Sequence, residues 1–197
     1  MNRNERRYFM ESQSEHRLLE EIRSGKKEAF AKLVEPLIPK AYHTALAILR
    51  SPHLAEEAVQ NAMIEAYQSI KAGKEIRHFN GWFSRVIANR ALDLVRKENR
   101  FDGLDIESVI VNDTSSSPVE KILRKEQSSE ILEAVMSLDI QQRTVIVLYY
   151  FQEMKIDEIA NVLHVNEGTV KTRLHRARNR LSKLVSFPDL NTKVAQL

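Results

Sequence analysis

The stretch IDEIANVLHVNEGTVKTRL, residues 156–174, decides the fold of the C-terminal part of the chain. Ile159 and Leu163 recur at helical spacing and predict one short amphipathic helix. Residues 164–166 separate it from a second helical pattern that carries apolar residues one turn apart. Ala160 supplies the small side chain that two crossing helices require. The spacing therefore predicts a helix-turn-helix.

His164 occupies the turn position at which most such motifs place glycine, because the backbone there tends toward positive φ. Histidine tolerates this conformation better than branched residues do, at a cost of about 1 kcal/mol. The alternative is a metal ligand. The nearest other histidine is His175 and the chain contains no cysteine, so the sequence gives a metal site little support.

The second helix of this motif is strongly basic. Between Lys171 and Lys183 it carries six lysines and arginines, one histidine and no acid. A merely solvated basic helix is the simplest interpretation, but side chains of one charge sign repel each other unless an anion binds. In a helix-turn-helix, the first residues of the second helix reach base edges in the major groove and later arginines neutralise phosphates. DNA is therefore the expected partner.

Composition limits the classes of protein that remain. The chain has 197 residues, of which 43% are hydrophobic and 29% charged, which suits one generous domain or two small ones and excludes disorder throughout. The absence of cysteine excludes a disulfide scaffold and a cysteine nucleophile. The longest apolar run, Val145–Phe151, is far shorter than the roughly 20 residues that span a bilayer. The charged N-terminus does not resemble a signal peptide, so we expect a cytoplasmic protein without membrane insertion.

A change of charge sign divides the chain. A basic segment ends at Arg100, and the next twenty residues, 101–120, contain five acids and no lysine or arginine. The polar run 113–118 is typical of an extended linker. Apolar residues on both sides recur at helical spacing, so the predicted fold class is all-α: two small helical domains joined by a flexible linker, the C-terminal one a helix-turn-helix. The predicted boundaries are a tail at 1–14, a helical domain at 15–100, an acidic linker at 101–127, a second domain at 128–185 and a tail at 186–197.

The helix expected after Ser51-Pro52 has two faces. Serine suits the N-cap and proline the first helical position. An apolar stripe runs from Ala55 to Ile70, and the opposite side is polar. Taken alone, such a polar side is a solvated face. A glycine-bearing loop, residues 72–77, then leads to a final helix with a basic edge.

Together, these segments resemble the extracytoplasmic-function (ECF) branch of bacterial sigma factors over nearly the whole chain. Residues 167–178, EGTVKTRLHRAR, resemble the most specific part of that family's region 4. The segments EEAVQ at 56–60 and WFSRVIANRALD at 82–93 resemble its region 2. The resemblance implies an alternative sigma factor that binds core RNA polymerase, directs it to specific promoters and assists promoter melting. It does not imply an enzyme. The first domain would be region 2 and the second region 4.

The resemblance also implies three sets of binding residues. The minus-thirty-five element would meet Thr169, Lys171, Thr172, Arg173, His175, Arg176 and Arg178. The minus-ten element would meet Lys74, Arg77, Arg85, Asn89, Arg90, Asp93, Arg96 and Lys97. The clamp of the large catalytic subunit of RNA polymerase would meet Glu56, Glu57, Gln60 and Asn61. Promoter opening also requires the capture of an unstacked base. The resemblance implies that Asn89 takes part in this capture.

Several points stay open at the level of sequence. The loop at 71–75 lacks the aromatic-arginine-glycine run often found in the family. Trp82 and Phe83 either stack on the melted strand or belong to the core, and their place in a helical apolar stripe favours the core. The acidic linker is compatible with a basic channel in the polymerase. The resemblance further implies a membrane-bound anti-sigma factor as a partner, and no cofactor, metal or small-molecule substrate.

Three other classes of protein compete with this interpretation. Operator-binding response regulators also carry Thr-Val-Lys in a helix-turn-helix, but usually have an α/β receiver domain, which the helical first domain contradicts. An enzyme is disfavoured because no catalytic motif pairs the carboxylates and the five glycines are too widely spaced for a phosphate-binding loop. A helical adaptor for another protein is the third alternative.

Overall fold

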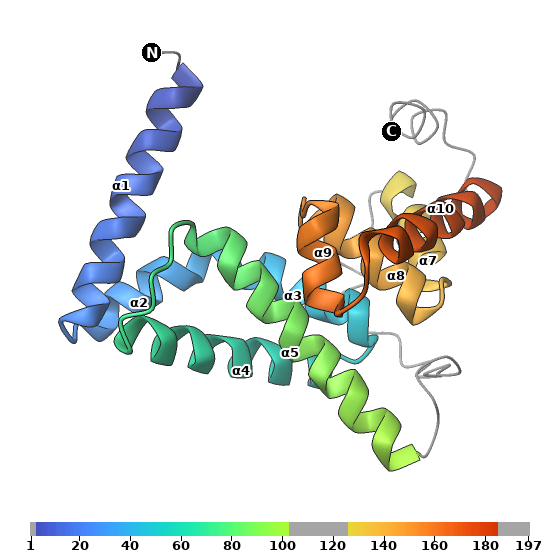
Figure 1. Ribbon diagram of the computed structural model, residues 1–197, viewed down its shortest axis with the longest axis horizontal. Coiled ribbons are helices and arrows are strands. Elements are labelled where there is room, and N and C mark those ends of the chain that lie inside the picture. The colour runs from blue at the N-terminus through green and yellow to red at the C-terminus, as the bar shows by residue number, and fades with distance from the viewer. Residues whose placement is uncertain (1–2, 103–125, 185–197) are drawn as a thin grey trace.

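The computed structural model describes the backbone of residues 3–102 and 126–184 and, within them, the side chains of 13–97 and 131–184. Every regular element in these ranges is helical, as the all-α prediction requires (Figure 1). The first unit, residues 3–102, contains α1 (Arg3–Arg23), α2 (Lys27–Val34), the 3-10 turn η1 (Glu35–Leu37), α3 (Ile38–Leu49), α4 (Pro52–Lys71) and α5 (Phe79–Asp102). The second unit, residues 126–184, contains α7 (Glu126–Met136), α8 (Ile140–Ile146), the π-helical turn η2 (Val147–Phe151), α9 (Ile156–Leu163) and α10 (Glu167–Leu184).

The helix ends differ in places from the predicted boundaries. Helix α1 begins at Arg3, inside the segment predicted as a tail, and its N-terminal part projects away from the other helices (Figure 1). Helix α5 ends at Asp102 and α7 begins at Glu126, so each enters the predicted linker by two residues. The rest of that linker and the C-terminal tail lie outside the described residues. Among the helices of 3–102 and 126–184, none is long and apolar enough to cross a membrane.

Local capping sets the ends of the helices in the first unit. The Ser51 side chain accepts a hydrogen bond from the Leu54 amide at 3.3 Å, and Pro52 takes the first helical position of α4, as predicted. Gly25, at φ 103°, follows the end of α1, a conformation that suits glycine. Arg50 ends α3 in the left-handed region, at φ 57°.

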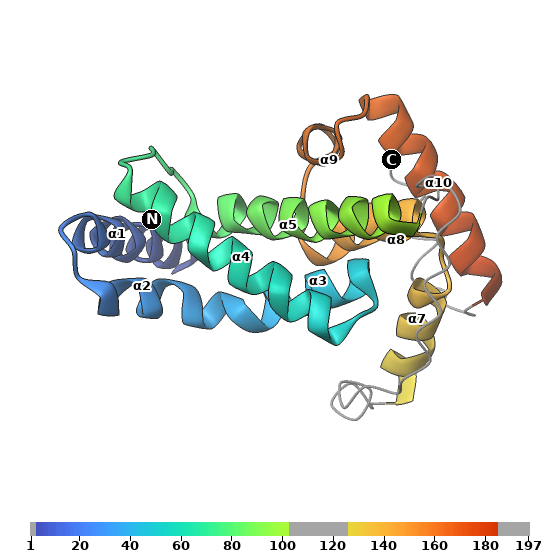
Figure 2. The same cartoon turned by 90° about the horizontal axis from the view of Figure 1, so that it is seen from below.

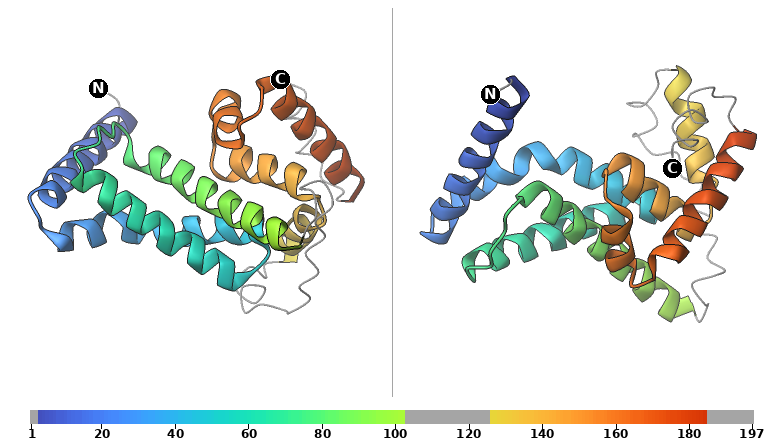
Figure 3. Two further views of the ribbon diagram at one scale, coloured as in Figure 1. Left: turned by 60° about the horizontal axis from the view of Figure 1, so that its bottom comes forward. Right: turned by 45° about the horizontal axis from the view of Figure 1, so that its top comes forward.

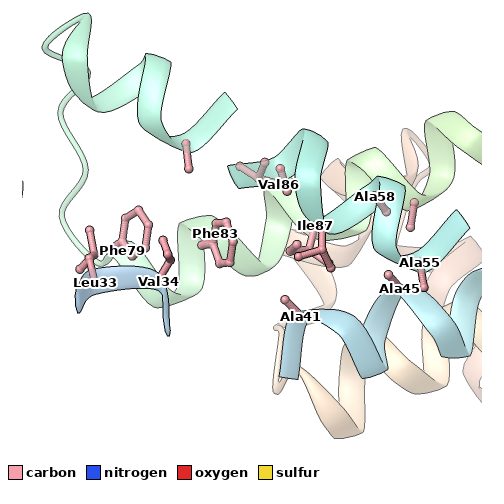
Figure 4. Packing of buried hydrophobic residues seen from close by; sticks show 14 of the residues in the cluster. Leu33, Val34, Ala41, Ala45, Ala55, Ala58, Phe79, Phe83, Val86 and Ile87 are labelled. Atoms are coloured by element: carbon pink, nitrogen blue, oxygen red, sulfur yellow. The ribbon is translucent and has the colours of Figure 1, made fainter. Parts of the chain in front are cut away.

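Apolar side chains from α1 to α5 form the core of the first unit. Phe83 is only 2% exposed and its ring stacks on that of Phe79, with centroids 5.5 Å apart. Figure 4 shows these rings facing Leu33 and Val34 of α2. Further along, alanines of α3 and α4 fill the same core, and their small side chains let the helices approach closely. Phe83 therefore belongs to the core, as the sequence favoured, whereas Trp82 is half-buried.

The second unit has a core of its own, built from α8, α9 and α10. Val145, Ile159 and Val170 are fully buried in it, and Ala160 of α9 is buried in the same cluster. The predicted helix-turn-helix is confirmed.

The two units pack directly against each other. Helix α9 lies beside α5, and α8 with η2 lies against α3 (Figure 2, Figure 3). Ala88 of α5 is completely buried within the core of the second unit, and Ile140 of α8 packs against that of the first. This contact brings the helix-turn-helix next to the last helix of the first unit.

Candidate nucleic-acid interface

The turn between α9 and α10 has the conformation that the sequence predicted. His164 lies in the left-handed region at φ 55° and ψ 42°. The Val165 amide donates to the Ala160 carbonyl at 3.0 Å, which closes the end of α9. The turn sets the angle at which α10 leaves α9.

Asn166 caps the start of α10, a role that was not predicted from the sequence. Its Oδ1 accepts hydrogen bonds from the Thr169 amide at 2.7 Å and the Thr169 hydroxyl at 3.0 Å. A larger residue at position 168 would place its Cβ 3.2 Å from the same oxygen, which is a tight contact. Glycine therefore leaves room for the Asn166 side chain at the start of α10. The preference of asparagine for N-caps was the signal that could have identified it.

Helix α10 has one buried and one exposed face. Val170, Leu174 and Ala177 are buried against the second unit's core. The opposite face exposes Lys171, Thr172, His175, Arg176 and Arg180. The structure thus gathers four of the residues predicted for the minus-thirty-five element on one accessible surface.

The polar groups of this face are held to different degrees. Lys171 Nζ lies 3.6 Å from Glu167 Oε2, an exposed pair that contributes little. Thr172 donates its hydroxyl proton to the Gly168 carbonyl at 2.9 Å, and His175 forms a 3.0 Å hydrogen bond with the Asn179 amide. Arg176 has no hydrogen bond or ion pair within the described parts of the chain, so its guanidinium is available to a ligand.

Two predicted arginines of α10 point elsewhere. Arg178 lies over two aromatic rings, with Cζ 5.4 Å from the Tyr149 centroid and 5.6 Å from that of Tyr150. Arg173 is half-buried, and this burial lowers its pKa while the charge of Asp139 opposes the shift. Arg178 thus joins α10 to the rest of the second unit, and Arg173 is only partly accessible.

The residues predicted for the minus-ten element lie on α5 and the preceding loop, and four charged groups at this site form a network. Arg90 lies 3.0 Å from Glu65 of α4 and 3.2 Å from Asp93. Arg96 reaches the other oxygen of Asp93 at 3.0 Å. The contact with Glu65 is an ion pair only, because neither Arg90 Nε nor Glu65 Oε2 has a hydrogen-bond partner. The network fixes α5 against α4 while leaving its arginines partly exposed.

The loop between α4 and α5 presents further cations. Lys74 Nζ lies 5.2 Å from the centre of the Trp82 ring. Arg77 forms an exposed ion pair with Glu75 at 3.2 Å. Lys97 is exposed and Asn89 is half-buried. The predicted set is thus spread along the loop and the length of α5 rather than gathered in one pocket.

Arg85 departs from the other predicted minus-ten residues, because it contacts the second unit. Its Nη2 donates to Glu158 Oε1 of α9. Glu158 Oε2 also accepts a hydrogen bond from the Lys155 amide at 3.0 Å, which caps α9.

The polar face of α4 holds the residues predicted for polymerase binding. Glu56 and Gln60 are exposed, and Glu57 and Asn61 are half-buried. On the same helix, Ile64 is 56% exposed, a large apolar side chain that was not singled out from the sequence. The face is a polar surface with an apolar side chain one turn beyond Gln60.

Arg143 of α8, which was not selected from the sequence, is a buried cation between the units. It is 4% exposed. Its Nε donates to the Ala47 carbonyl at 2.6 Å, Nη2 to that of Ile48 at 3.1 Å and Nη1 to that of Leu138 at 2.7 Å. Burial, and then the nearby charge of Arg50, lowers its pKa to about 10, so it is protonated at neutral pH.

Comparison with known proteins decides the family. Residues 33–101 match the sigma-70 region 2 family and residues 128–181 match sigma-70 region 4. Over 175 residues the chain is 33% identical to the ECF RNA polymerase sigma factor SigW of Bacillus subtilis (strain 168), covering 84% of this chain and 93% of SigW. The chain belongs to the ECF RNA polymerase sigma factors. It is an alternative sigma factor, which directs RNA polymerase to specific promoters.

Other relatives agree with this assignment. The ECF sigma factor SigM of Mycobacterium tuberculosis (strain H37Rv) is 29% identical over 172 residues, 87% of this chain and 83% of SigM. The structure of RpoE from Bartonella quintana, in complex with the anti-sigma factor NepR, superposes with a TM-score of 0.56 at 24% identity, covering 81% of this chain and 98% of RpoE. The structure of CnrH in complex with the cytosolic domain of CnrY superposes with a TM-score of 0.57 at 23% identity. The match covers 87% of this chain and 96% of CnrH. Both structures share the fold of this ECF sigma factor, whose partners are core RNA polymerase and promoter DNA.

Proposed function

We propose that the exposed face of α10 reads the minus-thirty-five element, with Lys171, Thr172, His175 and Arg176 at the DNA. The observation that carries this assignment is the unpaired Arg176 guanidinium on the exposed side of a helix-turn-helix's second helix. A bidentate arginine contact to guanine contributes about 1–3 kcal/mol of discrimination. Thr169 supports the N-cap, Arg178 orients the helix through Tyr150, and Arg173 is a half-buried member of the predicted set.

The same proposal assigns the minus-ten element to the loop and α5 of the first unit. Lys74, Arg77 and Lys97 are exposed cations that suit a single-stranded backbone. Asn89 would contact a captured base. Arg85, Arg90, Asp93 and Arg96 complete the set, although each already has an ionic partner in the structure.

For polymerase binding, we assign the polar face of α4: Glu56, Glu57, Gln60 and Asn61. Support comes from the exposure of Glu56 and Gln60 on a helix whose other side is buried. We further propose that an anti-sigma factor binds this chain, as NepR binds RpoE and the cytosolic domain of CnrY binds CnrH. On this proposal the protein works in the cytoplasm without covalent chemistry of its own, and 15–100 and 128–185 are the functional domains.

Reconstituted transcription tests these assignments. The purified chain is mixed with sigma-free core polymerase and a DNA library of random sequence, and the transcribed templates are sequenced. A shared two-part motif is expected. Gln60→Ala should reduce transcription from every template, because it weakens polymerase binding. Arg176→Ala should instead relax the sequence preference of the upstream part of the motif.

Matched controls separate these effects from general damage. Gln68→Ala removes an exposed amide from α4 outside the assigned set, and Lys183→Ala removes one charge from the far end of α10. Both should transcribe like the unaltered chain. If Arg176→Ala leaves the upstream motif unchanged, the assignment to α10 is wrong. If the chain binds DNA without core and no transcript appears, the proposed assignments of residues to the promoter elements and to the polymerase are wrong.

A further inference from the structure

Helix α1 contacts the loop between α4 and α5 at both of its ends. Near the start of the loop, Arg23 donates from Nη2 to the Lys74 carbonyl at 3.0 Å. In the opposite direction, the Lys71 ammonium donates to the Arg23 carbonyl at 3.3 Å. At the end of the loop, the Phe79 amide donates to Glu15 Oε1 at 2.7 Å. One helix is therefore bonded to the chain where α4 ends and again where α5 begins.

The contact at Phe79 is a helix cap supplied by another helix. Phe79 is the first residue of α5, and its amide has no carbonyl partner within that helix. A carboxylate is a favourable acceptor at this position, because the N-terminus of a helix carries partial positive charge. Glu15 lies 64 residues away in the sequence, so this cap fixes the start of α5 to α1.

Helix geometry sets the spacing of the two contacts. Glu15, Leu19, Ile22 and Arg23 recur at helical spacing and share one face of α1. Leu19 and Ile22 are 1% and 0% exposed in the core of the first unit, so the face is anchored between its polar contacts. These contacts are eight residues apart, about 12 Å along a helix. Helix α1 thus fixes both ends of the loop, which lies beside it (Figure 1, Figure 2).

The loop presents most of its side chains to solvent. Ile76 is buried in the core of the first unit, whereas Lys74, Glu75 and Arg77 are exposed. Lys74 is held on two sides, because α1 binds its carbonyl and its ammonium lies 5.2 Å from the centre of the Trp82 ring of α5. The position of the exposed cations of the loop therefore depends on contacts from α1.

We propose that Glu15 and Arg23 are positioning residues for the minus-ten element: by holding both ends of the loop, they set where Lys74 and Arg77 meet the melted strand. This role rests on the minus-ten assignment proposed above, and neither residue touches DNA. A loop that is ordered before DNA binds has less conformational entropy to lose when it captures a strand. Loss of either contact should therefore weaken the reading of the minus-ten element and spare the minus-thirty-five element.

The fluorescence of Trp82, the single tryptophan of the chain, tests whether α1 holds the loop. The ring is half-buried in the first turn of α5. In the full chain without DNA, Glu15→Ala and Arg23→Met should increase the quenching of this fluorescence by acrylamide. Glu15→Gln retains an acceptor for the amide at the start of α5 and should be quenched like the unaltered chain. Glu20→Ala and Arg17→Ala change exposed residues of the same helix and serve as matched controls.

Transcription from the random library then separates positioning from general stability. Glu15→Ala should relax the base preference in the downstream part of the motif. It should also reduce transcripts from the best template about fivefold, the factor that corresponds to one lost helix cap. The upstream preference should stay unchanged, and Glu15→Gln should restore the downstream one. Ile48→Val, in the last turn of α3, lowers the stability of the same core and should leave both preferences unchanged.

Two results would overturn the positioning role. Unchanged quenching in Glu15→Ala and Arg23→Met would show that α1 does not hold the loop. A downstream preference that persists in both variants, or that is lost together with the upstream one, would show that the contacts with α1 do not act on the minus-ten element. If the unaltered chain gives no shared motif, the promoter assignments themselves fail. The quenching, measured without DNA or polymerase, still decides in that case whether α1 holds the loop.

Discussion

Arg178 donates a hydrogen bond from Nε to the Tyr150 hydroxyl at 3.0 Å and so joins the recognition helix α10 to the π-helical turn η2. The two residues are far apart in sequence, and both side chains are half-buried. The contact orients α10 from the side opposite its exposed face. Helix α10 is thus held by its apolar residues and by one polar anchor.

Tyr150→Phe should lower the free energy of unfolding by about 1 kcal/mol, because it removes a partly buried hydrogen bond and keeps the ring under the guanidinium. Urea unfolding followed by circular dichroism measures the effect. Tyr149→Phe is the matched control, since its ring also lies under Arg178 but its hydroxyl does not accept the Nε bond. Equal losses in the two variants would show that the bond contributes nothing.

Asn166→Ala should destabilise the second unit by about 1 kcal/mol, because the Thr169 amide loses its capping acceptor. Asn166→Asp keeps a carboxylate oxygen there and should retain most of the stability. Asn161→Ala, an exposed asparagine of α9, serves as control in the same unfolding experiment. The cap assignment does not survive if the 161 and 166 variants unfold at the same urea concentration.

His164→Gly should raise stability by about 0.5–1 kcal/mol, because glycine adopts the left-handed conformation without the steric cost that histidine meets at φ 55°. His164→Val should lower it, since a branched side chain fits this conformation worst. Thermal unfolding of the unaltered chain and of the glycine and valine variants measures the order of their stabilities. An increase in Tm with valine would contradict the strain at this turn.

Phe83→Ala should cost about 3–5 kcal/mol, because its buried ring fills the first unit's core. Phe83→Leu, which fills more of the space, should cost much less. If Phe83 instead stacked on DNA, both changes would reduce promoter melting and leave the unfolding midpoint unchanged. Trp82→Phe, at the half-buried neighbour, should have a small effect on stability.

Much of the fold was predictable from local patterns. The helix-turn-helix, the left-handed His164, the Ser51-Pro52 start and the core position of Phe83 were all predicted, and the structure confirms them. These features depend on residues a few positions apart, so their spacing and backbone preferences can be read locally. Helix α5 ends at Asp102 and α7 begins at Glu126, each two residues inside the predicted linker, because composition alone does not specify where a helix ends.

The candidate site was predictable only in part. Lys171, His175 and Arg176 share an exposed face because helical periodicity puts them there. The partners of Arg178 and Arg85 could not be predicted, since Tyr150 and Glu158 lie far away along the chain. A basic residue in a DNA-binding helix looks the same in sequence whether its charge is free or already paired.

By itself, the sequence determined that this chain is helical, that it has two units and that its last helix is the basic half of a helix-turn-helix. Periodicity, capping residues and charge are sufficient for that, because each acts over a few residues. Only the tertiary structure decided which cations remain unpaired and that Arg143 caps α3 from the other unit. Such pairings depend on how whole helices pack. Every residue carries a carbonyl acceptor, so the sequence does not show which carbonyl will accept a hydrogen bond from a distant arginine.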